Sequence, residues 1–543
     1  MAEPWRVSVA LSGGGHRASG WGIGTLYGLL RTRDAERAKP DGGRPFEIVS
    51  VASVSGGSIT NGVVARETDL ATVSIDEFCT ALGPLIETVA TKGLIPARGR
   101  TWGYFLMLVA SLAVFVVALV VAVTVVATVG RGDPSWGGLA LWYGVAFVVI
   151  AVVLVVLPRL RAARRHAPPP KVPIIVVGLV ALLLAVAFVT HRLAGNTHGT
   201  AAWITAVACV VAVALLGILA VALVSRRGVV LRGALDRLHF DGATLADVGG
   251  KPTRHVFCAT ELQSGHQCFL SSDLVIEWNS GEGTPGSLSV ATAVQASAAL
   301  PGGFPPVEVD LDAAGVQLVR SWEPDGAPPV PVRRLVLADG GVYDNMGDEW
   351  ELGYADRARR SDLLDERGQG NFLVVANAGK NLGWKSFATS GRLTREVRGL
   401  MRDQSIEYDA TTSQRRRMLL ALFRQSEQAG KGLVGTLTHV PTTPVAVCEA
   451  FVRGNDARAA RAVTCRDALE VTGEPWDAIS HRNGNVSTTL GAISKERTVE
   501  LILHAATLTA VSCFVVHGAG DVSALPSRAE ITAWVDDATA RST

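Results

Sequence analysis

The feature that most constrains the fold of this chain is a set of four long stretches without any charged side chain. They span residues 104–129, 139–157, 172–190 and 201–224. A helix needs about 20 apolar residues to cross the hydrocarbon core of a bilayer, and one Lys or Arg at its centre costs about 2.5–3.5 kcal/mol. Consecutive core helices of a soluble protein would each keep a polar stripe toward water. The sequence therefore predicts four transmembrane helices within residues 101–226.

The basic residues that flank these stretches predict the orientation of the chain. The segments before the first stretch, between the second and third, and after the fourth hold eleven Lys and Arg, against two in the other connections. Positively charged segments favour the cytoplasmic side. We therefore expect a multi-pass protein of the cell membrane with both flanking parts, residues 1–100 and 227–543, in the cytoplasm. An even number of spans lets these parts meet, and we expect them to form one discontinuous domain.

Net charge and cysteine usage exclude several classes of protein. The net charge is +2, and no cluster of Lys and Arg of the kind that binds nucleic acid stands out. The seven cysteines are scattered, odd in number and free of any Cys-x-x-Cys pair. Neither a disulfide framework nor a zinc site is expected.

A glycine-rich turn lies near the start of the chain. Residues 5–11 form an apolar run typical of a buried strand, and Ser12-Gly13-Gly14-Gly15-His16-Arg17-Ala18 precedes a helical segment at 18–31. Strand, glycine turn and helix together direct free N–H groups at one point, which suits an anion. That anion is either a phosphate, because Gly13-x-Gly15-x-x-Ala18 satisfies the dinucleotide pattern, or the oxyanion of acyl transfer. The acidic residue that a dinucleotide site needs is not obvious in the sequence.

A second strand candidate ends in a serine. Residues 46–54 lead into Ser55-Gly56-Gly57-Ser58, and 59–67 continue as a helical segment. A nucleophilic serine needs such a turn, since it exposes Oγ and places it at a helix N-terminus. The G-x-S-x-G pattern is met at Ser55 and Gly57, with Ser53 in place of the first glycine. Ser53 and Ser58 are the alternative nucleophiles.

An aspartate follows a third strand candidate. Residues 333–338, Arg-Arg-Leu-Val-Leu-Ala, form this strand candidate, and Asp339-Gly340-Gly341 comes directly after them. A carboxylate at the end of a strand lies where α/β sheets build their sites. Alone, the same residues would more often form an Asx-type turn.

Taken together, these three stretches resemble the patatin-like phospholipase family. The matching motifs are Gly13-Gly14-Gly15-x-Arg17, Ser55-x-Gly57 and Asp339-Gly340-Gly341, in the order in which the family carries them, and residues 257–265 and 296–306 are also similar to the family. The resemblance covers roughly the first 70 residues and residues 250–380. It implies a three-layer α/β/α domain with a mainly parallel sheet, which the predicted four-helix membrane insertion would interrupt.

The resemblance also implies an activity, the hydrolysis of ester bonds in membrane lipids. Ser55 would be the nucleophile and Asp339 its base, with Gly13, Gly14 and Gly15 holding the oxyanion. Arg17 would meet a lipid phosphate or brace the loop through a salt bridge. No metal and no cofactor are implied. The expected partners are the lipid substrate and the bilayer, without nucleic acid, and the oligomeric state stays open.

Two other functions are compatible with the sequence. A Ser–His–Asp hydrolase would recruit His439, His481, His504 or His517, none of which lies in a recognisable motif. A channel or transporter would use the four apolar stretches themselves, but these hold none of the charged residues that usually mark an ion or substrate path. In the C-terminal part of the chain, Arg415-Arg416-Arg417 is expected to form a solvated helix face or to contact anionic lipid.

Overall fold

The computed structural model describes residues 3–40, 42–94, 224–320, 332–365, 368–379, 392–454 and 456–540, with isolated positions between 108 and 222 and between 382 and 386. By its contacts the chain divides into two compact units, Met1–Pro96 with Leu231–Thr543, and Ala97–Val230. The four predicted membrane spans lie outside the described residues, apart from isolated helical positions. The fold below is that of the first unit.

The first unit is built on a ten-stranded mixed sheet whose order is β10-β9-β1-β2-β3-β4-β5-β6, with β8 also paired to β3 and β7 to β8. The parallel part consists of β10 (Val434–His439), β9 (Phe372–Asn377), β1 (Trp5–Leu11), β2 (Phe46–Ser53) and β3 (Arg254–Glu261). The antiparallel part consists of β4 (Gln267–Ser271), β5 (Val275–Glu277), β6 (Gly281–Gly283), β7 (Val307–Asp310) and β8 (Arg334–Asp339). The strands predicted at 5–11, 46–54 and 333–338 are confirmed.

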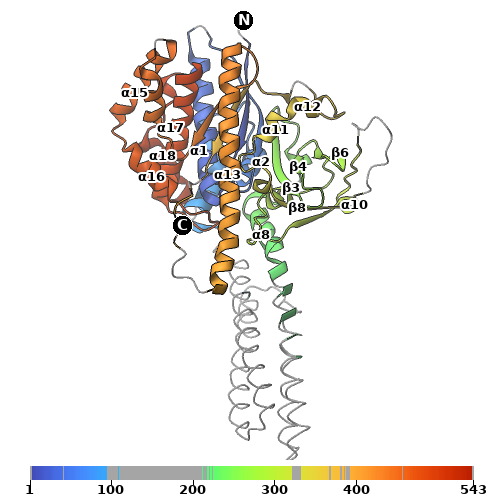
Figure 1. Cartoon of the computed structure of the whole chain (residues 1–543). Helices are drawn as coiled ribbons and strands as arrows, with labels where there is room; N and C mark the ends of the chain where they lie inside the picture. Colours follow the sequence, from blue (N-terminus) through green and yellow to red (C-terminus); the bar gives the residue numbers. More distant parts are fainter. Residues whose placement is uncertain are drawn as a thin grey trace, which may run out of the picture. The chain divides into compact units, whose positions relative to one another are not determined.

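Helices cover both faces of this sheet (Figure 1). Alternate side chains of a strand point to opposite faces: Val9 and Leu11 of β1 join the cluster of α1 and α17, whereas Ala10 packs with Phe423 of α13. The chain is therefore an α/β protein with a large, mostly parallel sheet flanked by helices. The helices of the first face include α1 (Gly15–Ala38), α2 (Gly56–Glu67), α3 (Ile75–Glu87), α17 (Lys495–Ser512) and α18 (Arg528–Ala540), and those of the second α11 (Glu349–Leu352), α12 (Tyr354–Ala358) and α13 (Arg392–Ala429).

Further helices connect these elements. They are α8 (Arg227–Leu235), α9 (Val290–Ser297), α10 (Leu311–Ala314), α14 (Pro444–Val452), α15 (Ala457–Thr472) and α16 (Trp476–Gly484). Short helical turns are η1 (Thr88–Lys92), η2 (Asp236–Phe240), η3 (Ala246–Val248), η4 (Gly340–Val342), η6 (Cys513–His517) and η7 (Val522–Ala524).

Helix α1 is buried on nearly all sides because α17 packs on the face turned away from the sheet. Glycines allow this approach: a Cβ at Gly24 would lie 2.5 Å from Ile502 O, and one at Gly28 2.5 Å from Ala506 O. Among the described residues, one helical stretch, Lys495–His517, is long and apolar enough to cross a bilayer, but 89% of its apolar window is buried inside the domain. This stretch is therefore the core helix that completes the packing around α1.

Candidate active site

The carboxyl ends of β2 and β8 meet head-on along one edge of β3. Strand β4 occupies the other edge of β3, so β2 and β8 share this one. Strand β2 runs parallel to β3 until Ser53 lies beside Phe257, and antiparallel β8 arrives from the opposite direction until Asp339 lies beside Ala259. Ser55 is two residues beyond Ser53, and Ala259, the partner of Asp339, is two residues beyond Phe257, the partner of Ser53. The strand register alone therefore brings Ser55 to the level of Asp339.

Ser55 stands at a strained turn between β2 and α2. Its φ of 52° and ψ of −116° lie in a region that L residues seldom adopt, and such strain persists only where the surroundings hold it in place. Ser55 is the N-cap of α2 but its side chain makes no capping hydrogen bond, and the residue is partly exposed. Its hydroxyl is therefore presented outward at a helix N-terminus, as a nucleophile requires.

The turn is also held by the segment that follows α9. The Ser55 N–H donates to the carbonyl and to the Oγ of Ser297, at 3.1 Å each. Two residues later, the carbonyl of Ala299 accepts from the Asp339 N–H at 3.1 Å. The segment 297–299 thus connects the serine turn to the aspartate turn. The sequence resemblance to the patatin-like family included residues 296–306, but it predicted no role for Ser297 in particular.

Asp339 is buried, with 2% of its surface exposed. Its Oδ1 accepts from the Gly341 N–H at 2.8 Å, and the Ser55 side chain lies close enough to stabilise the charged carboxylate. Burial raises the pKa of Asp339 to about 7, against the smaller opposing effects of Gly341 and Ser55. A carboxylate with this pKa is a much stronger base than an exposed aspartate, and the strand register brings it to the level of the hydroxyl that it would deprotonate.

The alternative serines are placed differently. Ser53 donates to Val256 O at 3.0 Å, and Ser58 bonds to Ser53 Oγ at 3.0 Å and to Ser297 Oγ at 2.7 Å. Both side chains are fully buried in this network. Because both hydroxyls are already hydrogen-bonded within the protein, Ser55 is the candidate nucleophile among the three serines.

The glycine turn packs directly against the serine turn. A Cβ on Gly56 would collide with the carbonyl of Gly15, and one on Gly13 would lie 3.3 Å from Ser55 Cβ. The Gly13 N–H donates to Asn345 O at 3.0 Å. Gly14 and Gly15 have positive φ angles of 144° and 61°, and within the described part of the chain their N–H groups have no acceptor. Two donors, not three, are free to hold an oxyanion.

Arg17 is a brace for this turn. The side chain is 2% exposed, its Nε donates to Ala378 O at 2.9 Å, and one terminal nitrogen donates to Val486 O at 2.6 Å. Its other terminal nitrogen lies 3.5 Å from where a Gly14 Cβ would stand. Burial lowers the pKa of Arg17 to about 10, which leaves it cationic at neutral pH. The bracing partners are carbonyls and not the predicted salt bridge, and the buried side chain does not face an external phosphate.

The four histidines considered for a triad lie away from Asp339. His439 ends β10, three strands from β2, which is about 14 Å at normal strand spacing. His504 contacts Thr442 O at 2.8 Å, and His517 contacts Gly435 O at 3.0 Å near the amino end of β10. His481 is exposed and contacts Asn485. In the described residues no histidine bonds to the Asp339 carboxylate.

A dinucleotide site is not supported either. In such sites a carboxylate at the end of the second strand binds the ribose. Strand β2 ends at Ser53 and passes directly into Val54 and Ser55. The backbone of Gly56 also occupies the space beside Gly15.

Helix α13 contributes a buried ionic cluster beside the aspartate turn. Arg415 contacts Asp344 Oδ1 at 3.3 Å, Asp348 Oδ2 at 3.0 Å and Glu349 Oε2 at 2.9 Å. Burial, and then the charge of Asp344, raise the pKa of Asp348 well above its usual value. The prediction of a solvated face was wrong for Arg415, because periodicity does not reveal that a partner turn with two buried carboxylates covers it.

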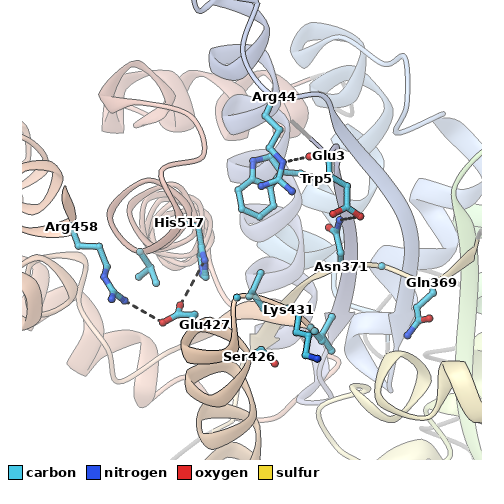
Figure 2. A pocket seen from close by; sticks show the side chains of 16 residues that line it. Glu3, Trp5, Arg44, Gln369, Asn371, Ser426, Glu427, Lys431, Arg458 and His517 are labelled. Carbon is cyan, nitrogen blue, oxygen red and sulfur yellow. Dashed lines mark hydrogen bonds and ion pairs between the residues drawn. The ribbon is translucent and has the colours of Figure 1, made fainter. Parts of the chain in front are cut away.

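A cavity of about 720 Å³ lies at the other end of the sheet, among the amino ends of β1, β9 and β10. Figure 2 shows Arg44 over the Trp5 ring and Glu427 between Arg458 and His517. Because Ser55 and Asp339 occupy the carboxyl ends of their strands, this cavity is separate from these two residues.

Comparison with known proteins adds no family assignment: neither a protein-family model nor a curated protein sequence matches the chain.

Proposed function

We propose that this chain is a serine hydrolase of lipid esters, patatin-like in fold and mechanism, with a Ser55–Asp339 dyad. The observation that carries the proposal is the meeting of the Ser55 turn with Asp339, a buried carboxylate whose pKa is raised to about 7, at one edge of β3. The strained turn at Ser55, the free N–H groups of Gly14 and Gly15, and the absence of a histidine from the Asp339 contacts described above favour a dyad over a triad.

In the first half of the reaction, Asp339 accepts the proton of Ser55 Oγ as Oγ bonds to the ester carbonyl carbon. The carbonyl oxygen becomes an oxyanion, which the Gly14 and Gly15 N–H groups stabilise, and loss of one such donor typically costs about 10²–10³ in rate. The buried Arg17 cation behind the loop adds favourable potential. The carbon–oxygen bond to the alcohol then breaks, and Asp339 returns its proton to the leaving alkoxide.

In the second half, water removes the acyl group from Ser55. Asp339 takes a proton from the water, whose oxygen bonds to the acyl carbon. The bond from that carbon to Ser55 Oγ breaks, Oγ recovers the proton, and the carboxylic acid leaves. Every step uses protein groups and water alone.

A lipid is the proposed substrate because the chain carries four uncharged stretches between the two halves of its α/β unit. Such stretches would keep the site at a membrane, with the α/β unit on the cytoplasmic side as the basic residues predict. A soluble short-chain ester and a phospholipid vesicle, assayed with the same preparation, separate the chemistry from membrane attachment: hydrolysis of the first alone would support the dyad and contradict the lipid substrate.

The test of the dyad is labelling of the full chain in detergent with a fluorophosphonate probe. We expect wild type to be labelled, Ser55→Ala to lose the label, and Asp339→Asn to label roughly 10²–10⁴-fold more slowly, as expected for loss of a general base. Ser58→Ala is the matched control and should retain the label. Undiminished labelling of Ser55→Ala would refute the proposal.

A further inference from the structure

Tyr408 of α13 lies beside the aspartate turn. Nothing in the sequence of its helix predicted a role for this tyrosine. A Cβ on Gly341 would stand 3.0 Å from Tyr408 Cε1 and 3.0 Å from Asp339 Oδ1. The phenol ring therefore borders the same glycine that hydrogen-bonds the carboxylate. Helix α13 is fixed in this position further along, where Arg415 binds the carboxylates that follow the turn.

The Tyr408 hydroxyl is buried and has no hydrogen-bond partner in the part of the chain that the structure describes. An unsatisfied buried polar group costs about 1–3 kcal/mol, and such groups are rare in native proteins. Burial, together with the negative charge of Asp339, raises the pKa of Tyr408, so the phenol keeps its proton at neutral pH. Among the described residues this hydrogen-bond donor has no acceptor, and it lies next to the proposed base.

The proposed mechanism says which part of a substrate comes to this place. Asp339 must return a proton to the leaving alkoxide, so the alcohol portion of the ester lies on the Asp339 side. The oxyanion lies on the side of Gly14 and Gly15, at the end of β1. A donor that borders Gly341 and Asp339 would therefore meet the alcohol portion and not the carbonyl oxygen.

We propose that Tyr408 donates a hydrogen bond to an oxygen of the alcohol portion and selects esters whose alcohol carries such an oxygen next to the scissile bond, as glycerol esters do. This inference rests on the proposed function. An ester of a plain alkyl alcohol leaves the phenol unsatisfied, and a site built to bond a substrate oxygen discriminates against the analogue that lacks it.

The experiment compares glycerol monooctanoate with propyl octanoate, which share the acyl chain and differ in the oxygens of the alcohol. For the full chain in detergent, we expect the ratio of kcat/KM for the glycerol ester to that for the propyl ester to fall about 10-fold to 100-fold in Tyr408→Phe. Tyr343→Phe, an exposed tyrosine of the same turn, is the matched control and should keep the wild-type ratio.

The outcomes separate this inference from the proposed function. Equal kcat/KM ratios in wild type and Tyr408→Phe overturn the inference while hydrolysis remains dependent on Ser55. An equal loss for both esters together with a shifted pH profile would mean that Tyr408 acts on Asp339 instead, and also overturns it. Hydrolysis that persists in Ser55→Ala would refute the dyad itself. Fluorophosphonate labelling of Tyr408→Phe at the wild-type rate shows that this variant is folded.

Discussion

The proposed dyad predicts an unusual pH dependence for the acylation of Ser55. Asp339 acts as a base only when ionised, and burial raises its pKa to about 7 from an ordinary value of 3.8. The rate of fluorophosphonate labelling should therefore rise about tenfold per pH unit below 7 and level off above it. At pH 5 about 1% of the carboxylate is ionised, so labelling should proceed at about 1% of the rate at pH 9.

The alternatives predict different curves. An aspartate with its ordinary pKa would be more than about 90% ionised at pH 5, and the labelling rate would hardly change up to pH 9. Burial lowers the pKa of His439, His504 and His517 to about 4 in each case, so a base of that kind would also give a flat curve over this range. A midpoint near pH 7 is thus specific for Asp339 among these four residues.

The assay is the pseudo-first-order rate of labelling of the full chain from pH 5 to pH 9 at constant ionic strength. His439→Gln is the control for the histidine whose charge environment includes Arg17, and it should keep the wild-type midpoint. His481→Gln serves the same purpose for the exposed histidine. A flat profile in wild type, or a profile with its midpoint near 7 that survives Asp339→Asn, would refute the assignment of Asp339 as the base.

Three further predictions concern stability and packing. A carboxyl with a raised pKa stabilises the fold below about pH 4 and loses that contribution as the pH rises through about 7. The free energy of unfolding of Asp339→Asn should therefore increase by about 3 kcal/mol relative to that of wild type when the pH is raised from about 5 to about 8, as measured by chemical denaturation. A difference that does not depend on pH would contradict the raised pKa. Gly56→Ala should abolish labelling because its Cβ meets a backbone carbonyl, whereas Gly484→Ala, with open space around it, should label normally. Arg415→Met should lower the free energy of unfolding by about 3–5 kcal/mol, since it leaves buried carboxylates unpaired. The control Arg416→Met should lower it by about 1 kcal/mol or less. Equal losses of unfolding free energy in the two variants would contradict the stabilising role of the Arg415 cluster.

Residue patterns predicted the strands of the site but not how those strands meet. Apolar runs and glycine turns identify β1, β2 and β8 because each run is short, buried and ended abruptly. The direction of β8 is not encoded in its own residues: it depends on pairing with β3, which lies about 80 residues earlier in the chain. The sequence therefore placed an aspartate at a strand end without showing that the strand arrives from the opposite direction.

Side-chain partners were harder to predict than backbone elements. Arg17 was expected to meet a phosphate or a carboxylate, yet it bonds to two carbonyls from segments 361 and 469 residues away in sequence. Tyr408 and Arg415 lie on a long polar helix whose pattern suggests a solvated surface. Their burial depends on the turn after β8 packing against that helix, and no local pattern reports such a contact.

The order of the motifs along the chain bears on how the site forms. Gly14, Gly15 and Ser55 belong to the piece before Ala97–Val230, whereas Ser297 and Asp339 belong to the piece after it. The earlier piece alone would present a strained serine turn with neither the hydrogen bonds from Ser297 nor a base. Strand β3, which aligns the two turns, is also in the later piece. Ser55 therefore gains its proposed base and its supporting hydrogen bonds only when both pieces lie in one compartment. An odd number of membrane crossings between the two pieces would be incompatible with the proposed dyad.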